Sequence, residues 1–224
     1  MVMLALDTST PTGSVAVGRN GEVLAESLLR VRATHSEAVL PEIHRVLTDC
    51  GLGASDLQAV IVGGGPGSFT GVRIAASLAK GMCHARDLEL FSFSSLAAVA
   101  VGAGCDGPVC AMFDARRGQV YAAGYRVGDG IKELFAPRAG ALENVLDDLD
   151  EPGKWCFAGD GAGAGDDAIR AAGGRILPVD TWVPRAGSLI WLASVVPEEG
   201  RVTDPGTWEP SYVRLPAAQR DLGG

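Results

Sequence analysis

Positive charge is in short supply in this sequence. Its 224 residues include 19 Lys and Arg against 27 Asp and Glu, which gives a formal net charge of −8. A protein that holds RNA on its own usually offers a basic surface to the phosphates. If this chain takes part in RNA chemistry, we therefore expect a different molecule to hold the RNA.

Long apolar runs are also missing. No apolar stretch approaches the roughly 20 residues that cross a bilayer as a helix. The first residues, MVMLALDTST, have a short apolar run with no basic segment before it, unlike a signal peptide. These features predict a cytoplasmic protein with no membrane association.

Cysteine and histidine are few, and their spacing suits no metal or redox motif. There is no CxxC pair, and the five cysteines are an odd number. We therefore expect free, buried thiols in a reducing compartment. Two helical histidines that bind a catalytic metal usually stand about three or four residues apart, and His35 and His44 are farther apart than this. No metal site is predicted.

The first half of the chain predicts three strands followed by alternating helices and strands. Asn20-Gly21 is a strong hairpin signal between two apolar runs. Thr34 and Glu37 have the spacing of a capping box. Pro41 should either begin the regular part of this helix or kink it. Strands are expected at 2–7, 14–18, 22–29, 59–62 and 90–93, and helices at 34–50, 72–83 and 96–101.

The same order restarts after the glycine-rich stretch at 102–107. ALDTSTPTGSVAV and MFDARRGQVYAA both run from an apolar strand through an Asp and a polar turn into a second strand. We therefore predict an α/β fold made of a duplicated βββαβαβ unit, as in the actin-like (ASKHA, ribonuclease H-like) superfamily. The two lobes are expected at 1–103 and 104–224. In the second lobe, strands are expected at 109–113, 119–126, 131–135, 155–158 and 175–179, and helices at 142–149, 166–172 and 186–196.

Asp7, Thr8 and Ser9 lie at the end of the first predicted strand, where open α/β sheets bind their ligands. An Asp in this place can hold a metal-bound water or the Mg²⁺ of a nucleotide phosphate. Asp114 ends the matching strand of the second half, and two such residues facing one cleft would form the phosphate site of the superfamily. The alternative is a plain turn, because Asp, Thr and Ser all stabilise turns.

The segment from Gly65 to Gly71, GPGSFTG, joins a predicted strand to a predicted helix. Its glycines allow backbone N–H groups to approach an anion, and Ser68 and Thr70 can donate hydrogen bonds. It lacks the Lys of a Walker A loop and the frame of a GxSxG nucleophile elbow. Two interpretations stay open: a phosphate loop that includes Gly67, Ser68 and Thr70, or a tight turn with Thr70 as the helix cap.

GDGAGAGDD, at 159–167, is a second glycine-rich loop between a predicted strand and a predicted helix. In the actin-like superfamily such a loop often lies against an adenosine. Its Asp residues would repel phosphate, so it suits a base or a ribose, or it is a flexible turn without a ligand.

The predicted helices at 34–50 and 72–83 carry apolar residues on more than one side. The small residues of the second helix allow another helix to approach closely, either inside the domain or across an interface. Apolar surface is left over for a partner at Leu40 and Leu47 in the first helix, and at Val72, Leu78 and Met82 in the second.

Six segments of the chain, in this order, resemble the bacterial TsaB (YeaZ) family from end to end. They are LALDTST, THSEAVLPEIHRVL, GGGPGSFTGVRIAASLAKG, FSSLAAVA, DARRGQVYAAGY and PSYVRL. GPGSFTG followed by Arg-Ile and Ala-Lys-Gly is highly specific for this family, and DARRGQVY is a strong second motif. The resemblance implies the actin-like fold with two lobes.

The resemblance also implies a function in making threonylcarbamoyladenosine next to the anticodon of tRNA. In this pathway the related subunit TsaD carries the metal and transfers the threonylcarbamoyl group, and the ATPase TsaE joins the complex. A TsaB-like chain is expected to be a non-catalytic scaffold or activating subunit that TsaD requires. It is expected to bind no tRNA alone and to require no cofactor, with room for weak binding of ATP or ADP at the lobe or partner interface.

Members of this family commonly form homodimers through the first two helices of the N-terminal lobe when TsaD is absent. The resemblance therefore implies that these two helices meet TsaD or a second copy. Carried onto this sequence, the interface is expected at His35, Leu40, Ile43, Leu47, Val72, Ala76 and Ala79.

Two other functions compete with this interpretation. An autonomous sugar-kinase-like or ATP-hydrolysing enzyme would use Asp7, Asp114 and the loop from Gly65 to Gly71. A metalloprotease, an older assignment of such proteins, is disfavoured by the missing metal ligands. Neither the residues nor the resemblance assigns a role to Arg116, Arg117, Tyr212 and Arg214.

Overall fold

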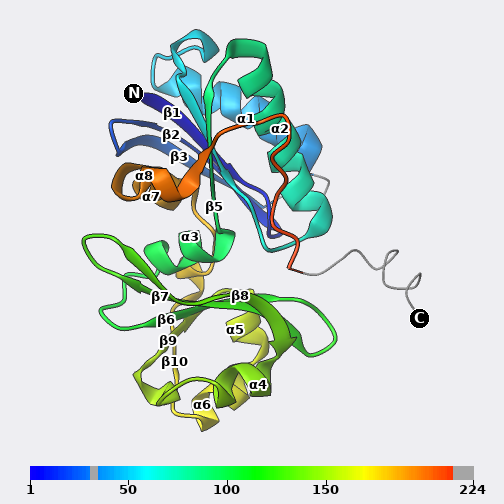
Figure 1. The fold of residues 1–224 in the computed structure, drawn as a ribbon, viewed down its shortest axis with the longest axis vertical. Coiled ribbons are helices and arrows are strands. Elements are labelled where there is room, and N and C mark those ends of the chain that lie inside the picture. Colours follow the sequence, from blue (N-terminus) through cyan, green and yellow to red (C-terminus); the bar gives the residue numbers. More distant parts are fainter. Residues whose placement is uncertain (31–34, 214–224) are drawn as a thin grey trace.

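The first of two sheets builds the upper lobe of this computed structural model, which describes residues 1–30 and 35–213 without the side chain of His35 (Figure 1). Its strands are β1 Val2–Asp7, β2 Thr12–Arg19, β3 Glu22–Arg30, β4 Ala59–Gly63, β5 Glu89–Phe93 and β11 Arg201–Val202. They lie in the order β11-β5-β4-β1-β2-β3. β1, β2 and β3 form the predicted antiparallel meander, and β4 and β5 continue the sheet in parallel on the other side of β1.

The second sheet repeats this arrangement in the lower lobe. Its strands are β6 Val109–Asp114, β7 Gln119–Val127, β8 Ile131–Ala141, β9 Cys156–Ala158 and β10 Arg175–Ile176. They lie in the order β10-β9-β6-β7-β8, with β6, β7 and β8 antiparallel and with β9 and β10 parallel to β6. The matching order and direction of the strands confirm the predicted duplicated α/β fold.

The two halves exchange helices. α3, Ser95–Gly102, follows β5 but packs against β6 and β7, whereas α7, Ala186–Val195, follows β10 but packs against β1 and β2. The two helices also contact each other between the sheets (Figure 1). One hydrophobic core cluster therefore contains residues of both sheets, such as Ile61 and Ala111.

The last part of the second half returns to the first sheet. α7 buries Leu189 and Ile190 completely, and α8, Pro197–Gly200, leads from it into β11. β11 then pairs with β5 at the edge of the first sheet. Residues 186–202 were expected in the lobe that starts at residue 104, but they pack with the first lobe because their apolar side chains are buried there.

The remaining helices cover the opposite faces of the sheets (Figure 1). α1, His35–Asp49, and α2, Phe69–Arg86, lie on the first sheet and share a second core cluster with it. α4 Leu142–Asp147, α5 Asp160–Ala164 and α6 Asp166–Ala171 share a third cluster with the second sheet. Among the described residues, no helix combines the length and the apolar character needed to cross a membrane.

Several local predictions need correction. α2 begins at Phe69 and not at 72, because Ser68 is its N-cap and accepts a hydrogen bond from the N–H of Gly71 at 3.4 Å. Thr70 is therefore not the cap. Pro41 lies inside α1, which already begins at His35. The cap predicted at position 34 lies outside the described residues, and the glycine-rich stretch at 159–167 contains the short helix α5.

The cysteines also differ from the prediction of five free thiols. Cys105 and Cys156 form a disulfide between the segment after α3 and strand β9. They are 51 residues apart in the sequence, so only the fold brings them together. Cys50, Cys83 and Cys110 are free. Burial raises the pKa of the Cys83 thiol to about 11 and that of the Cys110 thiol to about 12, which keeps both protonated at neutral pH.

Candidate functional site

Asp7 ends β1 inside the protein and not at its surface. Its side chain is completely buried, and so is that of Thr8. Oδ1 of Asp7 accepts hydrogen bonds from the N–H and the Oγ of Ser9 at 2.7 and 2.6 Å, and Oδ2 accepts one from the Oγ of Ser95 at 2.6 Å. Oδ1 therefore stabilises the turn after β1, and Oδ2 links this turn to the start of α3.

The glycines around GPGSFTG make room for this turn. A Cβ on Gly63 would lie 1.8 Å from Oδ2 of Asp7, and a Cβ on Gly67 would lie 2.4 Å from the carbonyl oxygen of Ser9. A Cβ on Gly71 would lie 1.9 Å from the carbonyl oxygen of Thr8. Any side chain at these positions would push the two segments apart.

Hydrogen bonds join the same two segments. The N–H of Ser68 donates to the carbonyl oxygen of Ser9 at 2.7 Å, and Oγ1 of Thr8 donates to the carbonyl oxygen of Gly71 at 2.6 Å. The geometry therefore favours the tight-turn interpretation of GPGSFTG over the phosphate-loop interpretation. The glycines serve the close contact with residues 7–9, and the Ser68 N–H has an internal acceptor.

A cleft opens beyond this contact, between the two lobes. It has a volume of about 620 Å³ and includes five residues predicted for a nucleotide site: Ser9, Gly67, Ser68, Thr70 and Asp114. Asp7 and Thr8 do not line it, because both side chains are completely buried. The expected arrangement of two Asp residues facing one cleft is therefore not present.

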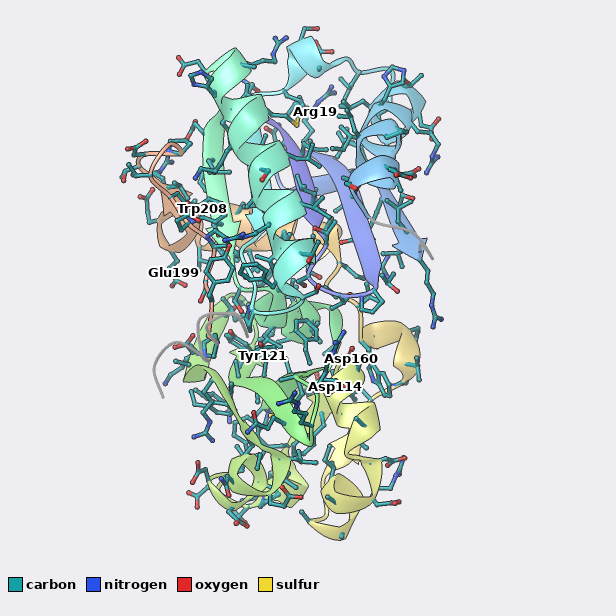
Figure 2. All side chains as sticks on the ribbon, turned by 90° about the vertical axis from the view of Figure 1, so that its right-hand side faces the viewer. Arg19, Asp114, Tyr121, Asp160, Glu199 and Trp208 are labelled. Carbon is teal, nitrogen blue, oxygen red and sulfur yellow. A yellow bond between two sulfur atoms is a disulfide. The ribbon has the colours of Figure 1, made fainter. Side chains whose placement is uncertain are left out.

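The wall of the cleft on the second lobe carries two carboxylates beside Arg116. Asp114 and Asp160 both line the cleft, and Figure 2 shows them with Tyr121 where the lobes meet. Oδ1 of Asp160 accepts a hydrogen bond from the N–H of Asp114 at 3.0 Å. Burial raises the pKa of Asp160, and the negative charge of Asp114 adds to this, against the lowering effect of the Asp114 N–H.

Arg116 and Arg117 form the turn between β6 and β7, and Arg116 also lines the cleft. Both have positive φ angles, 64° and 56°, and Gly118 follows with 70°. The N–H of Arg116 donates to Oδ1 of Asp114 at 2.7 Å, which fixes the turn. Both arginines are exposed. Within residues 1–30 and 35–213 no ion pair involves either of them, and no three His, Cys, Asp or Glu side chains are grouped to hold a metal ion.

Most of the predicted interface residues lie in the core. Five of the seven have exposed fractions of 4% or less: Ile43, Leu47, Val72, Ala76 and Ala79. Of these, Ile43, Leu47 and Ala79 belong to the core cluster that α1 and α2 share with the first sheet. Leu40 is 56% exposed and remains a candidate, whereas the side chain of His35 lies outside the described part.

The exposed face of α1 and α2 instead carries a shallow groove of about 530 Å³. Phe69, Ile74 and Leu78 give it apolar walls, and the sequence had marked only Leu78 of these three as spare apolar surface. Ser36 belongs to the lining and stands four residues before Leu40, on the same side of α1. The other lining residues are Thr70, Arg73 and Ser77.

Comparison with known proteins shows which family the chain is similar to. The family model TsaD, described as tRNA N6-adenosine threonylcarbamoyltransferase, matches residues 23–155, which is more than half of the chain. The TsaB protein of Escherichia coli is 32% identical over 230 residues, with 100% of this chain and 99% of that protein covered. The TsaB protein of Bacillus subtilis is 40% identical over 138 residues, but the match covers only 61% of this chain and 60% of that protein. Both are described as tRNA threonylcarbamoyladenosine biosynthesis proteins.

Solved structures show the same fold. A Pseudomonas aeruginosa protein described as similar to peptidase YeaZ superposes with a TM-score of 0.83 at 29% identity, over 95% of this chain and 99% of that one. YeaZ from Pseudomonas aeruginosa gives a TM-score of 0.80, also at 29% identity, over 94% of this chain and 99% of that one. The chain belongs to the TsaB (YeaZ) family of actin-like fold, and this membership supports a role in the biosynthesis of tRNA threonylcarbamoyladenosine.

Proposed function

We propose that this chain is a non-catalytic subunit that TsaD requires for transfer of the threonylcarbamoyl group to the adenosine next to the tRNA anticodon. In this proposal TsaD supplies the metal and the transfer chemistry, and TsaE supplies ATP hydrolysis. The chain requires no cofactor of its own and binds no tRNA alone.

The observation that carries the proposal is the use of Asp7. An Asp at the end of the first strand would hold a metal-bound water in an autonomous nucleotide enzyme of this fold. Here both of its oxygens accept hydrogen bonds from Ser9 and Ser95, and the carboxylate is sealed from the cleft. A carboxylate that is buried and bonded in this way supports the fold and does not face a ligand in the cleft.

The exposed face of α1 and α2 supports the part of the proposal that concerns binding to a partner protein. Its groove is lined by Phe69, Ile74 and Leu78, and Leu40 adds apolar surface nearby. Apolar patches of this kind on a protein surface are typical of protein interfaces. We propose that TsaD covers this face in the complex and that a second copy of the chain covers it in a homodimer when TsaD is absent.

Reconstitution tests the function directly. The purified chain is assayed for ATP hydrolysis with Mg²⁺, and then for threonylcarbamoyladenosine formation with TsaD, TsaE and tRNA. We expect no turnover by the chain alone and modification only in the complete mixture. ATP turnover by the chain alone on the order of 1 per second would instead support a sugar-kinase-like or ATP-hydrolysing enzyme that uses the cleft.

A second experiment tests the partner surface. Leu40→Asp places a charge on the exposed face and should abolish co-elution with TsaD. Val179→Asp is the matched control, because Val179 is 68% exposed in the second lobe, away from α1 and α2. Leu47 is unsuitable for this test, because an Asp at this buried position would unfold the protein. Unchanged co-elution of folded Leu40→Asp would contradict the proposed interface.

A further inference from the structure

Residues 203–213, at the end of the described chain, form a strap along α2. After β11 it runs beside the helix toward the helix N-terminus, as the orange-to-red trace in Figure 1 shows. Nζ of Lys80 donates to the carbonyl oxygen of Trp208 at 2.6 Å, and the N–H of Ser211 donates to the carbonyl oxygen of Gly64 at 2.9 Å. Figure 2 shows Trp208 beside α2. The strap thereby brings Tyr212 to the first turn of the helix.

Tyr212 holds the side chain of Arg73 together with Phe69. The two rings lie 5.3 Å apart, and the guanidinium carbon of Arg73 is 4.0 Å from the Phe69 ring centroid and 5.7 Å from that of Tyr212. Nε of Arg73 also donates to Oη of Tyr212 at 3.1 Å. An exposed arginine normally samples many rotamers, whereas this one is fixed by two rings and a hydrogen bond.

The charge of Arg73 is not neutralised inside the described chain. None of the nine ion pairs among residues 1–30 and 35–213 involves Arg73, although the protein has a net charge of −8. Within the described residues, the side chain of Arg73 donates one hydrogen bond, and it does so through Nε. The two terminal nitrogens of the guanidinium therefore keep the donors with which arginine pairs with a carboxylate.

Arg73 also lines the groove on the exposed face of α1 and α2, next to Phe69 and Ile74. An apolar depression with a fixed cation at its edge fits an apolar side chain of a partner with a carboxylate close by. A cation that is already ordered loses little rotamer freedom on pairing, so more of the interaction energy appears as affinity.

We propose that Tyr212 is a positioning residue that fixes Arg73 to pair with a carboxylate of the protein that occupies this groove. The inference rests on the proposed function, in which that protein is TsaD. It extends the residues that shape the partner surface beyond the first two helices to Tyr212 of the strap.

The test compares three variants for binding to TsaD by calorimetry at low and high salt. Tyr212→Phe keeps the ring but removes the hydrogen bond to Arg73, and should weaken binding about three- to tenfold. Arg73→Ala should weaken it more and reduce its salt dependence. The double variant should bind no more weakly than Arg73→Ala alone, because Tyr212 acts through Arg73.

Tyr125→Phe is the matched control for loss of a tyrosine hydroxyl. Oη of Tyr125 donates to Oγ of Ser94 at 3.3 Å, away from the groove. This variant should lower thermal stability while binding TsaD as the unaltered chain does. Tyr212→Phe should instead leave thermal stability unchanged and weaken binding of TsaD.

The possible outcomes separate the inference about Tyr212 from the proposed function. If the unaltered chain binds TsaD and Tyr212→Phe binds equally well, the inference is overturned while the proposed function stands. If the effects of Tyr212→Phe and Arg73→Ala multiply in the double variant, Tyr212 does not act through Arg73. If the unaltered chain does not bind TsaD, the proposed function and this inference both fail.

Discussion

At the scale of single residues, Asp7 and Asp114 occupy matching positions of the two halves but have different surroundings. Asp7 is buried with three donors around it, whereas Asp114 is exposed in the cleft. The sequence pattern around both residues is similar, and it correctly predicts a strand that ends at each Asp and a turn after it. It cannot predict the burial, because Ser95 reaches Asp7 from a segment 88 residues away.

Substitution of Asp7 should therefore reduce stability. Asp7→Ala leaves the donors of Ser9 and Ser95 buried without an acceptor, and should lower the free energy of unfolding by about 3 kcal/mol or more. Urea denaturation followed by circular dichroism measures this. Asp114→Ala is the control and should cost less than about 1 kcal/mol, because its bond to Arg116 is exposed to water. Equal losses for the two variants would contradict the structural role of Asp7.

Asp160 should make folding stability depend weakly on pH. The direction should be opposite to that of a carboxylate in an ion pair. Its pKa is raised in the folded protein, mainly by burial, above the value of 3.8 for a free carboxyl. The folded state therefore binds the proton more tightly, and stability is lost as pH rises from 3.8 through the folded pKa. Because residue 160 is partly open to water, we expect a modest effect.

Asp160→Asn removes this titration but keeps an oxygen for the N–H of Asp114. It should be more stable than the unaltered chain at pH 7, and the difference should shrink as pH falls below 3.8. Thermal unfolding across this range measures the difference. A difference that grows as the solution becomes more acidic would contradict the prediction.

At the scale of elements, α2 shows what periodicity can and cannot predict. Its apolar and small residues correctly predict a helix, but they lie on more than one side of it. Ala75 and Ala79 pack against the first sheet, whereas Ile74 and Leu78 line the exposed groove. The pattern alone does not say which side meets the sheet, and for this reason the predicted interface was placed largely in the core.

Two glycines of α2 provide a matched pair of substitutions. A Cβ at Gly71 would lie 1.9 Å from a backbone oxygen, whereas a Cβ at Gly81 has nothing within 4 Å. Gly71→Ala should therefore destabilise the protein by about 3 kcal/mol. Gly81→Ala should stabilise it by about 0.5–1 kcal/mol through helix propensity. Denaturant midpoints compare the two, and a tolerated Gly71→Ala would refute the tight contact with residues 7–9.

At the scale of the molecule, the exchange of α3 and α7 joins the lobes through a shared hydrophobic core. Each sheet buries one face against a helix from the other half, and one core cluster spans both sheets. Oγ of Ser14 donates to the carbonyl oxygen of Pro184 at 2.7 Å, and the N–H of Gly187 donates to Oε1 of Glu26 at 2.8 Å. The duplication was predictable from the repeated pattern, but the exchange was not, because helix order is the same with or without it.

Separated halves should therefore be unstable. A fragment of residues 1–103 lacks α7, which leaves one face of β1 and β2 uncovered, so it should show no cooperative unfolding transition alone. Co-expression with residues 104–224 should restore a soluble complex of the two fragments. A fragment 1–103 that folds alone would show that the shared core is not needed.

The exchanged helices also bear on how such a protein arose. A half-length ancestor with this topology would expose one face of its sheet unless a second copy lent its last helix in return. Such a chain would have been a two-fold dimer with exchanged helices before the two copies were fused. Gene duplication would then have joined partners that were already assembled, and the pseudo-symmetry of the lobes would preserve that dimer inside a single chain.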